Sequence, residues 1–234
     1  MAYDFKEEKD VKEFLENLGI EYRFGCYHEK KPEVCHLLGD YLESIKKDYE
    51  KAGKVYKTNC EDYSFPRSCY KIGNYTVIGK GKQKEDHGLA FDYYLKGCNL
   101  GEADACLNAG LLLTSKNTNV QIEKKHAQGV ALLERGCSLN HAYCCHFVSG
   151  IFISGIEEAS ISKNMEKAFK YGQKACELGN MYACANVSQM YMRGEGTAKN
   201  LELGEKFKKL AIEMRDEIVK KKPTLTFQQG TKPV

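Results

Sequence analysis

The chain is poor in proline, the strongest helix breaker, and it has little net charge. Its 234 residues include four prolines and no tryptophan, and 35 basic residues nearly balance 32 acidic ones, which leaves a formal net charge of +3. So small a charge gives no electrostatic basis for binding nucleic acid or an anionic membrane surface. No apolar run approaches the roughly 20 residues that a transmembrane helix needs, so we expect no membrane span.

Two further patterns are missing. The first ten residues are charged and acidic, so they resemble neither a secretory signal, which is basic and then apolar, nor an arginine-rich transit peptide. There is also no C-x-x-C sequence, the spacing that zinc sites and thiol-disulfide enzymes favour. We therefore expect no metal site.

Cysteine, in contrast, is abundant and regularly placed. Ten of the eleven cysteines form pairs whose members are eight or nine residues apart, and successive pairs begin 34 to 39 residues apart. A spacing this regular marks a repeated structural unit. The five pairs are Cys26–Cys35, Cys60–Cys69, Cys98–Cys106, Cys137–Cys145 and Cys176–Cys184.

Small and large side chains recur at fixed positions around each pair. Before the first cysteine they stand at steps of four, as Tyr56 does before Cys60. After the second cysteine they stand three, four and seven residues on, as Leu38 and Gly39 do after Cys35. This stripe is typical of packed helices, with a small residue where two helices approach. Each pair therefore lies at a junction, where one helix ends and the next begins.

Two Gly-x-Gly sequences, at 79–81 and 194–196, follow predicted helices. We interpret them as turns, with the first glycine in a left-handed C-cap, because a phosphate-binding loop would need a preceding strand. The sequence predicts an all-α protein of helix–loop–helix repeats. The expected segments are an N-terminal capping helix at 9–30, repeats at 31–65, 66–102, 103–141, 142–180 and 181–222, and a disordered tail at 223–234.

The junction geometry favours disulfide bonds within the pairs. Two cysteines eight or nine apart in one straight helix would be about 12–13 Å apart, too far to bond. Helices that reverse through a short turn bring their ends within the roughly 4.4–6.8 Å that a disulfide needs between α-carbons. Closing each small ring would add about 2.5 kcal/mol of stability. Buried thiols and zinc ligands are the alternatives.

Cys144 is the eleventh cysteine and the candidate free thiol, because Cys145 keeps the eight-residue register. A leftover thiol is reactive, binds a partner, or is simply buried. His141 and His146 lie nearby in the sequence, and a thiol with imidazoles is a haem-binding combination. We therefore name Cys144, His141 and His146 as the candidate haem site, although the sequence requires no cofactor.

Segments such as 175–186 (ACELGNMYACAN) resemble the cysteine-stapled Sel-like repeats, relatives of tetratricopeptide repeats. The resemblance covers about residues 10–220 and implies a right-handed α-solenoid of about five repeats stapled by disulfides. Two groups carry such staples. One comprises the secreted Helicobacter cysteine-rich proteins, which bind or hydrolyse β-lactams. The other is the cytochrome c oxidase assembly factor 7 family, from the mitochondrial intermembrane space.

The N-terminal third is similar to the assembly factor family, at 11–17 (VKEFLEN), 26–30 (CYHEK) and 40–43 (DYLE). The absence of a signal peptide agrees, because small intermembrane-space proteins can be retained by oxidative folding. Cys144 and the loop at 114–119 depart from the family's pattern.

This resemblance implies a soluble monomer of the intermembrane space that acts as a protein-interaction scaffold. Its expected partners are assembly proteins or subunits of respiratory-chain complex IV, with complex I as a further candidate, and the oxidative import machinery. An alternative is haem binding or thiol-disulfide exchange during complex IV maturation, the latter being the enzymatic option. A β-lactam enzyme is disfavoured. The spacing Ser-x-x-Lys occurs at Ser44–Lys47 and at Ser160–Lys163, but neither Ser-Asp-Asn nor Lys-Thr-Gly accompanies it. We therefore name no catalytic residue.

Overall fold

The structure is a computed structural model that describes residues 3–82, 84–115 and 122–221. Within these ranges it contains eleven α-helices and two short 3-10 segments, and the only strand-like pairing is an isolated bridge between Ile156 and Ile161. The predicted all-α fold is thus confirmed. None of the described helices is both long and apolar enough to cross a membrane. The predicted tail at 223–234 lies outside the described residues.

The chain divides into two compact units, at 1–139 and 140–234, and we describe each by itself. In the first unit the helices are α1 (Glu8–Tyr27), α2 (Pro32–Ser44), α3 (Tyr49–Glu61), α4 (Pro66–Val77), α5 (His87–Asn99), α6 (Ala103–Thr114) and α7 (His126–Ser138), with a 3-10 turn η1 at Lys80–Lys82. In the second they are α8 (Ala142–Ser154), α9 (Met165–Glu177), α10 (Met181–Arg193) and α11 (Leu201–Lys221), with η2 at Glu157–Ala159.

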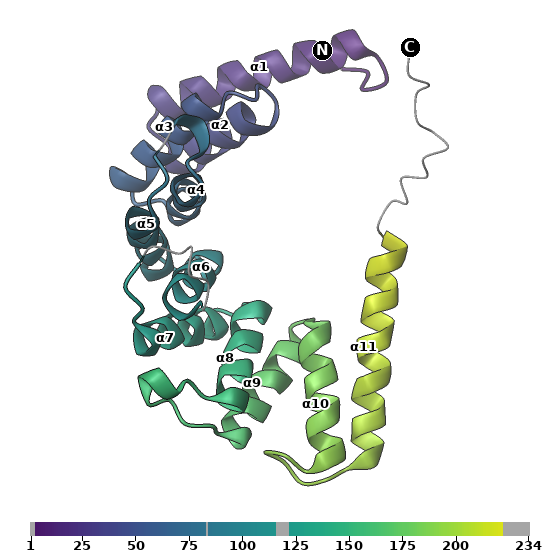
Figure 1. Ribbon diagram of the computed structural model, residues 1–234. Coiled ribbons are helices and arrows are strands. Elements are labelled where there is room, and N and C mark those ends of the chain that lie inside the picture. The colour runs from purple at the N-terminus through teal and green to yellow at the C-terminus, as the bar shows by residue number, and fades with distance from the viewer. Residues whose placement is uncertain (1–2, 83, 116–121, 222–234) are drawn as a thin grey trace, which may run out of the picture. The chain divides into compact units, whose positions relative to one another are not determined.

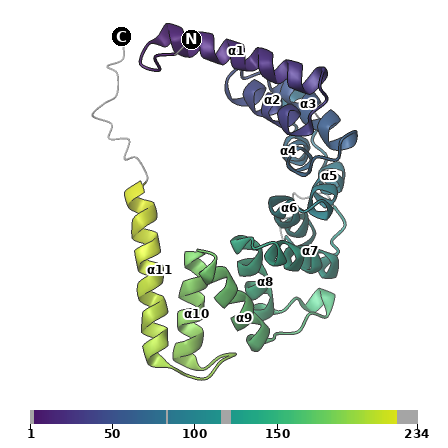
Figure 2. The ribbon, with the colours of Figure 1, turned by 180° about the vertical axis from the view of Figure 1, so that it is seen from behind.

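Helices of the first unit stack in two rows. Figures 1 and 2 show α2, α4 and α6 on one side and α3, α5 and α7 on the other. We call the surface formed by α2, α4 and α6 the inner face. In each repeat an inner helix packs antiparallel on the helix that follows it, the arrangement expected for helices joined by short loops.

A large ring on one helix packs against a glycine on its partner in the first two repeats. Tyr56 and Tyr94 are at most 2% exposed, and a Cβ atom placed at Gly73 would lie 2.6 Å from Cδ1 of Tyr94. Gly39 contacts Tyr56 in the same way. No larger residue fits beneath these rings, so the small position of the sequence stripe is required by close packing.

This pattern continues with changed residues in the other repeats. Gly110 packs against Leu133 in the first unit. In the second unit the glycine is on the second helix of the pair. Gly172 on α9 faces Ser149 on α8, and a Cβ atom placed at Gly172 would lie 3.1 Å from the serine Oγ. Each pair holds one small and one larger residue, so the helices stay close throughout.

The Gly-x-Gly sequences form turns, as predicted. Gly194 caps α10 in the left-handed conformation with φ of 74°, and Gly81 has φ of 68°. A side chain at Gly81 would collide with the carbonyl oxygen of Tyr49, and one at Gly196 with that of Met165. Both the backbone angle and the space therefore require glycine.

Candidate interaction surface

Disulfide bonds join consecutive repeats at the predicted junctions. Within each unit the α-carbons of the bonded cysteines lie 4.5–4.7 Å apart, and each bond links the last turn of one helix to the first turn of the next. Cys137 and Cys145 are each disulfide-bonded as well. The bonds that lie within one unit are Cys26–Cys35, Cys60–Cys69, Cys98–Cys106 and Cys176–Cys184.

The inner face of the first repeats carries a charged cluster. The hydroxyl of Tyr56 donates to Oδ1 of Asp40 at 2.6 Å and to Oε2 of Glu43 at 3.2 Å. Nζ of Lys71 lies 3.2 Å from Asp40 and 2.8 Å from Glu43. Nζ of Lys80 donates to the other oxygen of Glu43 at 2.6 Å. The residues come from α2, α3, α4 and η1, so the cluster ties the first two repeats together.

Glu43 is the centre of this cluster. Burial alone would raise the pKa of its carboxyl, but hydrogen bonds and charge from Lys71 and Lys80 outweigh that and lower the pKa to about 2. Lys80 also lies over the rings of Tyr49 and Tyr75, with Nζ 4.3 Å and 4.9 Å from their centroids. These rings favour the charged ammonium. Glu43 is therefore an anion at neutral pH, and its charge is compensated.

The next repeat has the same arrangement without charges. The hydroxyl of Tyr94 donates to Oδ1 of Asn74 at 2.7 Å, and Nδ2 of Asn108 donates to that same oxygen at 3.1 Å. These side chains, with Val77 and Leu111, line a pocket of about 310 Å³ on the inner face. Its apolar walls and partly exposed amides can hold an apolar side chain and hydrogen-bond a peptide backbone.

Beneath the charged cluster lies a buried polar group that joins α2, α3 and α4. His36 is 2% exposed, and its Nδ1 is 3.0 Å from Oγ of Ser68, which also accepts a hydrogen bond from Nδ2 of Asn59. Burial lowers the pKa of His36, while the charge of Asp40 opposes that shift. His36 is therefore a neutral part of the core at neutral pH.

A family model described as Sel1 repeat matches residues 32–54, 66–102, 143–180 and 182–216, together more than half of the chain. A curated relative from Drosophila melanogaster, named cytochrome c oxidase assembly factor 7 homolog, is 51% identical over 98% of this chain and 98% of its own length. The chain belongs to the cytochrome c oxidase assembly factor 7 family. Within that family, the human protein is 38% identical over 50% of this chain and 52% of its own length.

Solved structures support the same fold. A Sel1 repeat protein from Oxalobacter formigenes, 26% identical, superposes with a TM-score of 0.66 over 78% of this chain and 69% of its own. An Escherichia coli protective antigen, 13% identical, superposes with a TM-score of 0.60 over 85% of this chain and 53% of its own. The predicted solenoid of Sel-like repeats is thereby confirmed.

The Sel1 matches leave out residues 103–142, the region of α6 and α7. These two helices nevertheless follow the repeat, since Cys106 is bonded to Cys98 and Gly110 packs against Leu133. The packing of α6 on α7 therefore resembles that of the other helix pairs in the first unit.

The three candidate haem ligands lie on or next to α8. Cys144 and His146 are in the helix, and His141 directly precedes it. Cys144 is a fully buried thiol, and its backbone N–H donates to Nδ1 of His141 at 3.3 Å, which makes His141 the N-cap. His146 is two residues beyond Cys144 on the same helix, so the two side chains leave it on opposite sides. The structure does not bring the three candidate haem ligands together.

His146 lies in an aromatic environment instead. Its ring centroid is 5.9 Å from that of Phe147 and 6.2 Å from that of Tyr182, and burial lowers its pKa. Across the ranges that the structure describes, no three His, Cys, Asp or Glu side chains lie close enough to hold a metal ion.

Sequence reasoning missed the inner-face clusters. The signal was present: Asp40 and Asn74 are each five residues after the second cysteine of their pair, and Lys71 and Asn108 are each two after theirs. Polar residues at matched positions of successive repeats indicate one shared surface. Such a register comparison would have found them before the structure.

Proposed function

We propose that this chain assists the assembly of cytochrome c oxidase, respiratory-chain complex IV, as a disulfide-stapled protein-interaction scaffold. The observation that carries the proposal is the 51% identity to the Drosophila cytochrome c oxidase assembly factor 7 homolog over nearly the full length of both chains. A match at that level along the whole chain favours a shared role.

The inner face is the proposed docking surface. It offers a charged cluster around Glu43 and a neutral, partly apolar pocket beside Asn74 and Asn108. A partner segment lying along α2, α4 and α6 would meet both, because these helices are adjacent. Repeat arrays commonly bind extended segments on such surfaces.

We further propose the mitochondrial intermembrane space as the location. Five disulfide pairs at repeat junctions require an oxidising compartment, which the intermembrane space provides. Complex I is a second proposed target, carried over from the family resemblance. Protease protection of mitochondria with a selectively opened outer membrane tests the location, since the chain should become accessible only after that opening.

The assembly role is tested by complementation of cells that lack this protein. We expect the wild-type chain to restore complex IV measured on native gels, and Asn74→Ala/Asn108→Ala to restore less than half of it. Gln128→Ala on α7, an exposed amide away from the inner face, is the matched control and should restore it fully. Normal complex IV in cells without the chain would disprove the role. Full rescue by the double variant would show that the docking surface lies elsewhere.

A further inference from the structure

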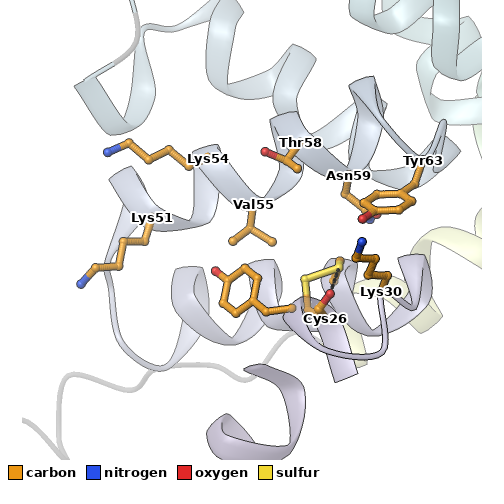
Figure 3. A pocket seen from close by; sticks show the side chains of 10 residues that line it. Cys26, Lys30, Lys51, Lys54, Val55, Thr58, Asn59 and Tyr63 are labelled. Atoms are coloured by element: carbon orange, nitrogen blue, oxygen red, sulfur yellow. Dashed lines mark hydrogen bonds between the residues drawn. A yellow bond between two sulfur atoms is a disulfide. The ribbon is translucent and has the colours of Figure 1, made fainter. Parts of the chain in front are cut away.

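A second pocket lies at the first junction of the array, between the C-terminus of α1 and one side of α3 (Figure 3). Its volume is about 340 Å³. The Cys26–Cys35 disulfide, Val55 and Thr58 line it, and two partly exposed rings, Tyr27 and Tyr63, complete its walls. It shares no lining residue with the inner-face pocket.

The following junction shows what fills the equivalent space. There Tyr93 on α5 donates its hydroxyl to Oε1 of Glu61 at 2.7 Å. Nζ of Lys96 donates to the carbonyl oxygen of Cys60, at the end of α3, at 2.6 Å. One junction further on, Arg135 donates to the carbonyl oxygen of Cys98 in the same way. Long side chains from α5 and α7 therefore reach across these two junctions.

The first junction has short residues at the matching positions. Tyr93 stands five residues before the cysteine that ends its helix, and Val55 stands at that position in α3. Lys96 stands two residues before that cysteine, and Thr58 takes its place. A phenol and a butylammonium are thus replaced by an isopropyl group and a hydroxyl. The pocket is the space that these two truncations leave open.

The charge at this junction is also changed. Tyr27 directly follows Cys26, the position that Glu61 takes after Cys60 at the next junction. The pocket lining contains three lysines and no carboxylate. Two of them, Lys51 and Lys54, pair with Asp48 and Glu50. Lys30 has no carboxylate within ion-pair distance among the described residues, and its amine points toward Asn59 and Tyr63 (Figure 3). The charged groups in the lining are therefore all ammonium groups, and an anion entering here would meet Lys30.

We propose that this pocket binds a segment of a partner protein that inserts an aromatic or large aliphatic side chain next to a carboxylate. The apolar part would occupy the volume that Tyr93 and Lys96 fill one repeat later, and the carboxylate would pair with Lys30. Protein side chains fill the equivalent space at the next junction, which is why the proposed occupant is a protein segment. The pocket is separate from the inner face, so this proposal can fail or stand without the complex IV role.

Three capped peptides test the chemistry: acetylated, amidated Gly-Tyr-Glu-Gly, Gly-Tyr-Gln-Gly and Gly-Tyr-Lys-Gly. They differ only in the residue that follows the tyrosine, which is anionic, neutral or cationic. Titrated into the full-length ¹⁵N-labelled protein, the Glu peptide should shift the backbone amide signals of Val55, Thr58 and Asn59. It should bind at least tenfold more tightly than the Lys peptide, with the Gln peptide between them. Tightest binding by the Lys peptide would overturn the proposal and make this a cation site like its filled counterparts.

Two variants test whether the peptides bind in this pocket. Val55→Tyr/Thr58→Lys installs the residues of the next repeat and should weaken the Glu peptide at least tenfold. Lys30→Ala should weaken the Glu peptide several-fold and leave the Gln peptide unchanged. A far-UV circular dichroism spectrum and a thiol count in denaturant confirm the fold and the disulfides. If the filled variant does not fold, Lys30→Ala decides alone. Unchanged binding of the Glu peptide in either folded variant, or no shift in the wild type, would contradict the proposal.

Discussion

The first two contacts between successive repeats place three polar side chains in the same geometry but use different chemistry. Where the first repeat meets the second, a carboxylate, a tyrosine and a lysine come together, and where the second meets the third, two amides replace the charged groups around an equivalent tyrosine. The glycine-to-tyrosine packing beneath them is common to both. Backbone repetition thus sets the geometry, while the polar groups on the surface can differ. The charged triad is Asp40, Tyr56 and Lys71, and the neutral triad is Asn74, Tyr94 and Asn108.

If the shared packing dominates, removing either ring should cost the same. We expect Tyr56→Ala and Tyr94→Ala each to lower the free energy of unfolding by about 4 kcal/mol, because both rings are at most 2% exposed and leave a cavity. Urea denaturation of the oxidised protein measures both. As a control, Tyr143→Ala, at an exposed ring on α8, should change stability by less than about 1 kcal/mol. A difference above about 2 kcal/mol between the two buried sites would show that they are not equivalent in packing.

Removing only the hydroxyl should separate the two triads. Tyr56→Phe loses a hydrogen bond to a carboxylate and should cost about 2 kcal/mol, whereas Tyr94→Phe loses one to a neutral amide and should cost about 1 kcal/mol. Urea denaturation at neutral pH measures both variants. Equal costs, or a larger cost at Tyr94, would contradict the distinction between charged and neutral acceptors.

Much of this architecture could be predicted from the sequence. The cysteine register locates the junctions, because a bond between residues eight or nine apart requires the helix to break between them. The stripe around Gly39 and Gly73 predicts close helix contacts, and the structure fills them with Tyr56 and Tyr94. Both signals are local, so they can be read along the chain.

The arrangement of polar groups on the surface was harder to predict from the sequence. The candidate haem ligands are near in sequence, yet helical phase puts Cys144 and His146 on opposite sides of α8. The inner-face partners are distant in sequence, since Lys80 reaches Glu43 across 37 residues. Proximity along the chain is a poor guide to proximity between repeats, and the first pocket becomes visible only when equivalent junctions are compared.

Acid should lower the contribution of the charged cluster to the free energy of unfolding and leave that of the neutral triad unchanged. The pKa of Glu43 is about 2 when folded and 4.5 as the ordinary value, so its contribution is present above pH 4.5 and is lost as the pH falls toward 2. The full shift corresponds to about 3 kcal/mol, and partial exposure reduces our expectation to about 1–2 kcal/mol.

Stability of the wild type and of Glu43→Gln, measured by urea denaturation from pH 7 to pH 2, tests this contribution. The two curves should converge in acid, because the wild-type advantage depends on the ionised carboxylate. Glu205→Gln, at an exposed site on α11, is the control and should follow the wild type throughout. A gap between the wild type and Glu43→Gln that persists at pH 2 would rule out the carboxylate charge as its source.

The smallest effect is expected when one triad is converted into the other. Asp40→Asn/Lys71→Asn gives the charged triad the amides of the neutral one, and the hydroxyl of Tyr56 keeps an acceptor as Tyr94 does. Partly exposed ion pairs contribute little, so the free energy of unfolding should change by less than about 1 kcal/mol. The difference between 0.1 M and 1 M salt should shrink, because fewer charges are screened. A loss above about 3 kcal/mol would mean that charge helps to set the geometry, and the two repeats would then not be alternative solutions on one scaffold.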